Sequence, residues 1–130
     1  DVYHLLSLLE SDAAGVVARN ATDAQLQTLQ ALHDELAACI DDREKFFAVN
    51  ERFHLQLLAL ADNRWRDQMV TDLRKVMKLN RHNSLFKQGR IEDSLAEHGA
   101  IMAALRARDA VAATQTMQAH FRNGLQAAAG

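Results

Sequence analysis

Apolar residues recur at helical spacing along nearly the whole chain and divide it into six segments. We place the segments at about residues 2–19, 22–40, 43–61, 63–82, 91–106 and 109–121, with an irregular loop over 83–90. The connectors are short, and short connectors favour antiparallel neighbours. The pattern therefore predicts an all-α fold, an antiparallel, up-and-down bundle of six helices.

Residues that commonly cap helices stand where several of the predicted helices begin. Thr22 is followed by Gln25 three positions later, which has the form of a capping box. Other candidate caps precede later helices: Asp41, Asp42, Asn63 and Asp109. The apolar stripe of the fourth helix holds Trp65, Met69, Leu73 and Val76, and that of the first helix begins at Leu5. We expect Trp65 in the core, together with Phe46 and Phe47.

Composition limits the class of protein. The 130 residues suffice for one domain, which we place at 1–130; proline is absent, and only 5 residues are glycine. The formal net charge of -2 excludes a strongly basic DNA-binding surface within this segment. No apolar run approaches the roughly 18 residues of a membrane span, and a single cysteine excludes an internal disulfide. We expect a cytoplasmic fragment, because no initiator Met or signal peptide is present.

Four polar side chains interrupt the predicted apolar stripes. Asn50 and His54 are spaced i, i+4 and share one face of the third helix. His98 lies on the stripe of the fifth helix, and His120 on that of the sixth. If residues 106–109 form the turn of a hairpin, His98 and His120 differ in height by about 3 Å and should face each other.

Three imidazoles and an oxygen donor inside a bundle predict a divalent metal site. Zinc is the expected ion and nickel the second choice, because imidazole suits both. A single histidine of this kind is more often a hydrogen-bonded core residue than a ligand. Three of them at matched heights favour the metal.

Three segments of the chain resemble the FCD domain, the ligand-binding half of FadR-subfamily GntR transcription regulators. The residues that carry the resemblance are NERFHLQLLALADN (50–63), SLAEHGAIMAALRARDAVAATQTMQAHF (94–121) and LLESDAAGVVARNAT (8–22). The resemblance implies an all-α, antiparallel bundle of six to seven helices with a central metal and ligand pocket. Such a domain senses an effector, binds a small carboxylate or hydroxy acid, and is not an enzyme. It also implies a homodimer, and DNA binding only through a winged helix-turn-helix domain upstream of this fragment.

The resemblance assigns roles to residues of this chain. Asn50, His54, His98 and His120 stand where the family's metal ligands stand; many members have Asp at the first position, so Asn50 keeps an oxygen donor without its charge. A neutral donor set leaves the full charge of the ion to attract an anionic effector. Arg74, Arg81 and Ser94 are candidates to contact that effector, with a solvated helix face as the alternative for each arginine. Leu6 replaces an arginine that many members carry.

Two enzymatic alternatives use the same residues. A metal-dependent hydrolase would need a general base, and Glu51 and Glu97 each neighbour a ligand but point about 100° away from it. A di-iron bundle is suggested by the E-x-x-H spacing of Glu51 and His54, but it requires a second such motif. Neither His98 nor His120 has a glutamate three positions earlier.

Overall fold

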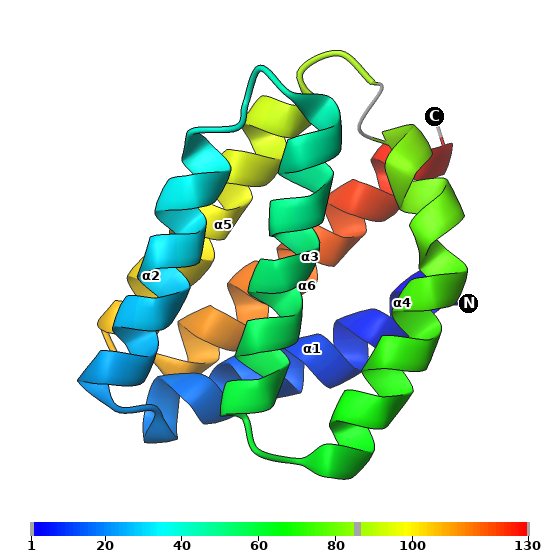
Figure 1. Ribbon diagram of the computed structural model, residues 1–130. Coiled ribbons are helices and arrows are strands. Elements are labelled where there is room, and N and C mark those ends of the chain that lie inside the picture. The colour runs from blue at the N-terminus through cyan, green and yellow to red at the C-terminus, as the bar shows by residue number, and fades with distance from the viewer. Residues whose placement is uncertain (1, 85–86, 130) are drawn as a thin grey trace.

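The computed structural model describes the backbone of residues 2–84 and 87–129 and the side chains of residues 2–78 and 87–128. These residues form six α-helices and no strand (Figure 1). The helices are α1 (Val2–Asn20), α2 (Asp23–Ala37), α3 (Arg43–Leu60), α4 (Arg64–Ser84), α5 (Arg90–Arg106) and α6 (Ala110–Ala129). The predicted all-α class is confirmed. The predicted loop is shorter at both ends, because α4 continues to Ser84 and α5 begins at Arg90.

Side-chain caps fix several helix starts as the sequence predicts. Thr22 Oγ1 accepts a hydrogen bond from the Gln25 backbone N–H at 3.1 Å, and Gln25 Oε1 accepts from the Thr22 N–H at 2.9 Å. Asp42 and Asp109 accept bonds from backbone N–H groups in the first turns of α3 and α6, at 3.1 and 3.0 Å. The helix boundaries therefore follow from local sequence.

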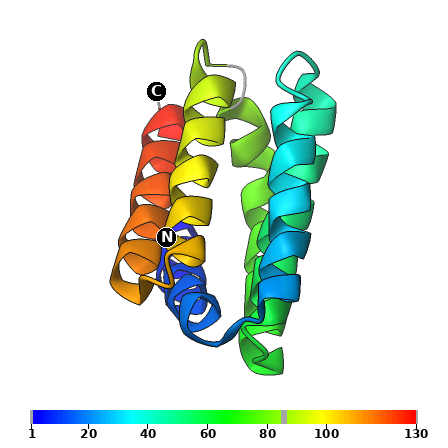
Figure 2. The same cartoon turned by 90° about the vertical axis from the view of Figure 1, so that its left-hand side faces the viewer.

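The helices pack as antiparallel neighbours around a shared interior. α1 lies against α6, α5 pairs with α6, and α2 pairs with α3, while α4 covers α1, α3 and α6 (Figures 1 and 2). At Gly15 the helices α1 and α6 approach so closely that an added Cβ would lie 2.8 Å from Oγ1 of Thr114. This packing brings the middle parts of α1, α3, α5 and α6 together.

The buried core consists of one large and one small cluster. The large cluster holds apolar residues from all six helices, including Leu6, Phe53, Leu57, Ile101 and Met117. The small cluster contains Leu36, Cys39, Phe46, Phe47, Val49 and Ile91. Phe46 and Phe47 are buried as expected, and the polar residues discussed below lie among the apolar side chains of this interior.

Most of the predicted core face of α4 is wrong, and of its four residues only Leu73 packs against the large cluster. Trp65 is 70% exposed, Met69 53% and Val76 62%. The buried face of α4 carries Val70, Arg74 and Met77 instead. An apolar stripe predicts burial only when the opposite face is more polar, and here the inward face contains an arginine whose charge is neutralised inside the bundle.

A similar rotation affects α1. Leu5 is 46% exposed, whereas Leu6 is fully buried. The inward face of α1 therefore runs through Leu6, Glu10, Ala14 and Val17. None of the helices in the described part of the chain combines the length and apolar character needed to cross a lipid bilayer.

Candidate metal centre and ligand pocket

Three histidines from three helices meet in the middle of the bundle. His54 comes from α3, His98 from α5 and His120 from α6, and all three are buried. One ring nitrogen of each lies within 4.8 Å of those of the other two. The rings of His98 and His120 have centroids 4.7 Å apart and planes at 87° to each other, so the α5–α6 hairpin places the two side chains opposite each other at one height, edge to face.

Asn50 lies one turn before His54 on α3 and is 4% exposed. It lines the same pocket as His54 and His120. Four buried polar atoms in this region have no hydrogen-bond partner among the described residues: Asn50 Oδ1, His54 Nε2, and Nδ1 and Nε2 of His98. Buried polar atoms are nearly always paired, so a group of unpaired ones in one place indicates a ligand or ion site.

Glu10 orients the first histidine. Nδ1 of His54 donates to Oε1 of Glu10 at 2.6 Å, and both side chains are almost completely buried. Because an ionised carboxylate only accepts, Nδ1 carries the ring proton and Nε2 keeps its lone pair. Burial raises the pKa of Glu10, but attraction to Arg74 and the contact with His54 outweigh burial and lower this pKa to about 2.

Glu97 holds the third histidine in the same way. Nδ1 of His120 donates to Oε1 of Glu97 at 2.6 Å. Arg90 donates to both carboxylate oxygens at 2.9 and 2.8 Å, and Asn123 donates at 3.0 Å. Burial raises the pKa of Glu97, but the hydrogen bonds from His120 and Arg90 lower it to about 2. Both carboxylates are therefore ionised at neutral pH.

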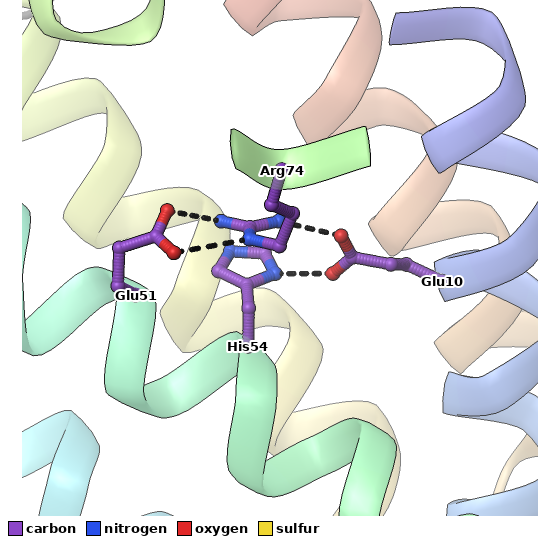
Figure 3. A network of polar contacts seen from close by, with 4 residues as sticks. All are labelled: Glu10, Glu51, His54 and Arg74. Carbon is purple, nitrogen blue, oxygen red and sulfur yellow. Dashed lines mark hydrogen bonds and ion pairs between the residues drawn. The ribbon is translucent and has the colours of Figure 1, made fainter. Parts of the chain in front are cut away.

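Arg74 connects three helices beside His54. Its Nη1 donates to Oε2 of Glu10 at 2.5 Å, and its Nη2 donates to Oε1 of Glu51 at 3.1 Å. Figure 3 shows the guanidinium between the two carboxylates and next to the His54 ring. Burial, followed by repulsion from Arg74, lowers the pKa of His54 to about 4 despite Glu10, and burial lowers that of His98 well below its usual value. Both rings are therefore neutral at pH 7, the state that binds metals.

A small pocket opens beside the histidines. Its lining includes Tyr3, Asn50, His54, Arg74, Met77, Arg90, Ser94, His120, Phe121 and Gly124. The cavity measures about 30 Å³. A buried water needs roughly 10–15 Å³ of such space, so the cavity has room for about two water molecules. An effector with several carbon atoms therefore needs the walls to move apart.

The donor set fits a divalent transition metal. Three imidazoles within reach of one another, with unpaired nitrogens and an amide oxygen nearby, are ligands that zinc and nickel accept. Carboxylates behind two of the rings are the usual support for ligating histidines. Glu10 and Glu97 bring negative charge to two of the rings, which a neutral donor set does not include, and Arg74 and Arg90 pair with these carboxylates in turn.

Two of the three residues predicted to contact the effector line the pocket. Arg74 and Ser94 both line the pocket and are buried, so neither lies on a solvated helix face. The guanidinium of Arg74 already binds two carboxylates. The side chain of Arg81 lies outside the described residues.

Sequence reasoning missed Glu10, Arg90 and the roles of Glu51 and Glu97. Glu10 follows Leu6 by one turn, so a stripe read through Leu6 would have shown an acidic residue facing inward. Glu97 does point away from His98, as helix geometry requires, and for that reason it faces His120 on α6. Glu51 likewise faces Arg74 on α4.

Known proteins share the helical fold of this chain. The chain matches the FCD domain over residues 1–123, whereas no curated protein matches it. A solved GntR structure from Streptococcus agalactiae has a TM-score of 0.82 and 28% identity, over 94% of this chain and 55% of that one. McbR/YncC from E. coli has a TM-score of 0.88 and 20% identity, over 98% and 66%. Lar, described as controlling the expression of the Listeria monocytogenes agr system, has a TM-score of 0.84 and 19% identity, over 98% of this chain and 61% of that one.

The chain thus spans between 55 and 66% of the length of these solved chains. The likeness to the second and third structures shows the shared fold. The FCD match and the likeness to a GntR chain agree with the prediction that the chain is not an enzyme. Since the match covers residues 1–123, the chain belongs to the FCD domain family.

Proposed function

We propose that this chain is the effector-sensing, metal-binding domain of a GntR-type transcription regulator that responds to a small organic acid. The observation that carries the proposal is the group of unpaired, buried oxygen and nitrogen atoms of Asn50, His54 and His98, which could ligate a metal and lie beside a pocket. A purely structural core would leave these polar atoms unsatisfied at a cost of about 1–3 kcal/mol each. A bound ion removes that cost.

The ligands in this proposal are Asn50, His54, His98 and His120. Zinc is the expected ion and nickel the alternative. When bound, the ion supplies a Lewis-acidic centre with open positions for an oxygen of the effector. Glu10 and Glu97 keep the protons of His54 and His120 on Nδ1, so that Nε2 of each ring faces the site.

Residues that line the pocket would contact the effector and respond to its entry. Ser94, one turn before His98, offers a hydroxyl from the wall of the pocket. Because the cavity is small, an acid that enters must separate helices that contribute to its walls, such as α4 and α5. We propose that this displacement is the signal passed on to the rest of the regulator.

The whole regulator would be a cytoplasmic homodimer with a winged helix-turn-helix domain upstream of residue 1. The solved chains that this one resembles are longer than it is, as that arrangement requires. The exposed stripe of Trp65, Met69 and Val76 on α4 is a surface that a second copy would cover.

Both glutamates that the hydrolase alternative offers as general base are engaged in ion pairs. Glu97 is held by Arg90, His120 and Asn123, and Glu51 is bound to Arg74. A carboxylate that is ion-paired in this way is a weak base. Sensing therefore fits the site better than water activation.

Metal content tests the proposal. Protein purified without added metal, then titrated with zinc and with nickel, should bind about one ion per chain by elemental analysis and calorimetry. Binding of neither ion would disprove the metal-binding part. If the metal-loaded protein is not further stabilised by any of a panel of small carboxylic and hydroxy acids, the effector part fails.

A further inference from the structure

The ends of three helices contribute to one part of the ligand pocket. Tyr3 lies in the first turn of α1, Arg90 begins α5, and Gly124 lies in the last two turns of α6. All three line the pocket that also contains His54 and His120. A Cβ added to Gly124 would lie 3.7 Å from Cε1 of Tyr3 and 3.9 Å from Nη2 of Arg90. Tyr3 and Arg90 therefore lie next to each other, beside the bare backbone of Gly124.

The hydroxyl of Tyr3 is a neutral hydrogen-bond donor in this part of the pocket. Tyr3 is 7% exposed. Burial raises the pKa of its hydroxyl above the usual value, and the guanidinium groups of Arg74 and Arg90 offset this only in part. The hydroxyl therefore keeps its proton at neutral pH. Because a hydroxyl both donates and accepts, it can hold a group of the protein and an oxygen of a ligand at once.

Tyr3 also has space into which it can move. Tyr3 and Phe121 line both the small pocket and a groove of about 330 Å³ between α1 and α6, so these two side chains separate the two spaces. The cavity beside the histidines measures only about 30 Å³, and a ligand that enters it needs a wall that can shift. Tyr3 is a wall of that kind.

We propose that Tyr3, Arg90 and Gly124 form the subsite for the part of the effector that lies beyond the metal, and that the Tyr3 hydroxyl donates to a carboxylate oxygen there. This inference rests on the proposed function, because it concerns the acid bound in the same pocket. Gly124 keeps the subsite open, since the space that a Cβ would fill lies in ordinary contact with both other side chains.

The single tyrosine of the chain makes the subsite directly observable. Isotope-labelled tyrosine gives one set of ring signals in nuclear magnetic resonance, and these signals report on Tyr3 alone. Titration of the zinc-loaded protein with acetate, a small acid suited to a small cavity, should shift them with the dissociation constant that calorimetry gives. Acetate binding without any shift of these signals overturns the inference.

Tyr3→Phe keeps the ring and removes the hydroxyl. Acetate affinity of the zinc-loaded protein should fall by about tenfold, equal to about 1.4 kcal/mol, as expected when a hydrogen bond to a charged group is lost. Imidazole affinity should change by less than about threefold, because imidazole binds the metal through one nitrogen and its other ring N–H only donates. A merely structural role of Tyr3 would change both affinities equally, and that result overturns the inference.

Gly124→Ala tests the same subsite with a variant that should fold. The added methyl makes ordinary contacts, and alanine favours a helix more than glycine does. Because the methyl fills the open space, acetate affinity should fall by at least about tenfold while zinc affinity is unchanged. Unchanged acetate affinity in this variant overturns the subsite, whatever the fate of Tyr3→Phe.

Ser11→Ala is the matched control, because it removes a buried hydroxyl from the same helix. Ser11 is 2% exposed, and its Oγ donates to the carbonyl oxygen of Leu8 at 3.3 Å. It is not among the described residues that line the pocket. The affinities for acetate and imidazole should both be unchanged. If Ser11→Ala weakens acetate binding as much as Tyr3→Phe does, the effect belongs to the helix and the role of Tyr3 is overturned.

The remaining outcomes separate the inference from the proposed function. If the protein binds zinc but not acetate, the subsite assignment fails and the metal-binding part of the proposed function stands. If the protein binds no metal, the proposed function fails and the inference falls with it.

Discussion

Glu10 and His54 form a hydrogen bond of 2.6 Å between α1 and α3, and neither side chain is more than 1% exposed. The same carboxylate pairs with Arg74 on α4. One buried acid thus ties three helices together and sets the tautomer of a candidate metal ligand. Stability and metal binding should therefore depend on it together.

Glu10→Gln should lower both stability and metal affinity. Removing one partner of a buried ion pair costs about 3 kcal/mol or more, because the remaining charge loses its compensation. Loss of the carboxylate behind a ligating histidine lowers metal affinity by about 10- to 100-fold. Urea unfolding of the metal-free protein measures the first effect and competitive zinc titration the second.

Asp12→Asn is the matched control for that variant. Asp12 lies two residues further along α1 and pairs with Arg66 on the same helix, α4, but its side chain is 66% exposed. The Arg66 side chain is 14% exposed, so this pair is buried on one side only, and with Asp12 in water it should contribute less than the fully buried pair of Glu10, about 1 kcal/mol. If Glu10→Gln were no more costly than Asp12→Asn, the buried network would have no special role.

His98→Ala should abolish the stabilisation that zinc gives. His98 is fully buried, and neither ring nitrogen has a hydrogen-bond partner in the part of the chain that the structure describes. A ligand that binds only the folded state at 100 times its dissociation constant adds about 2.7 kcal/mol. The melting temperature should rise with zinc in the wild-type protein and stay constant in His98→Ala. An equal rise in both proteins would contradict the assignment, and exposed His4→Ala should behave as the wild type.

The parts of this fold that sequence predicts are the local ones. Thr22, Asp42 and Asp109 cap helices through contacts three residues away, so the helix starts follow from short sequence patterns. The meeting of His98 and His120 also follows, because a short turn fixes the register of the two helices it joins. Each of these features depends on neighbours in the chain.

The long-range partners could not be predicted in this way. Glu10 is 44 residues from His54 and 64 from Arg74, and no periodicity connects them. From the sequence alone, Arg74 indicates the solvent-facing side of α4, and Trp65 indicates the side that faces the core. The neutralisation of one buried arginine therefore explains why the orientation of α4 was predicted wrongly.

Acid should destabilise the metal-free protein in two stages. The pKa of His54 is about 4 in the folded state, so between its usual value near 6.5 and 4 the unfolded chain binds a proton that the folded chain does not. Stability is therefore lost as the pH falls through that range. Glu10 and Glu97, with pKa values of about 2 when folded, lose their contribution between about pH 4.5 and 2.

Urea unfolding at pH 7.5, 6.0 and 5.0 measures the first stage. His98, whose pKa is also lowered by burial, should add to it. Glu10→Gln removes one contributor to the second stage, so its stability should fall less between pH 4.5 and 3 than that of the wild type. Equal stability of the wild-type protein at pH 7.5 and 5.0 would show that the buried rings are not held neutral.

Met69→Glu should weaken the proposed homodimer. Met69 is 53% exposed and lies one turn from Trp65, which is 70% exposed and has the guanidinium of Arg64 4.8 Å from its ring centroid. If a second copy covers this stripe, a carboxylate at residue 69 is buried without a partner, and the dimer dissociation constant should rise by about 100-fold. Sedimentation equilibrium measures the change.

Val111→Glu distinguishes this surface from apolar exposure in general. Val111 is 66% exposed on α6, so it is as accessible as the α4 residues, but it does not belong to their stripe. A carboxylate there should leave the dimer intact, because the side chain stays in water. Dissociation by Val111→Glu and not by Met69→Glu would place the interface on α6, and the exposed stripe of α4 would then need another explanation.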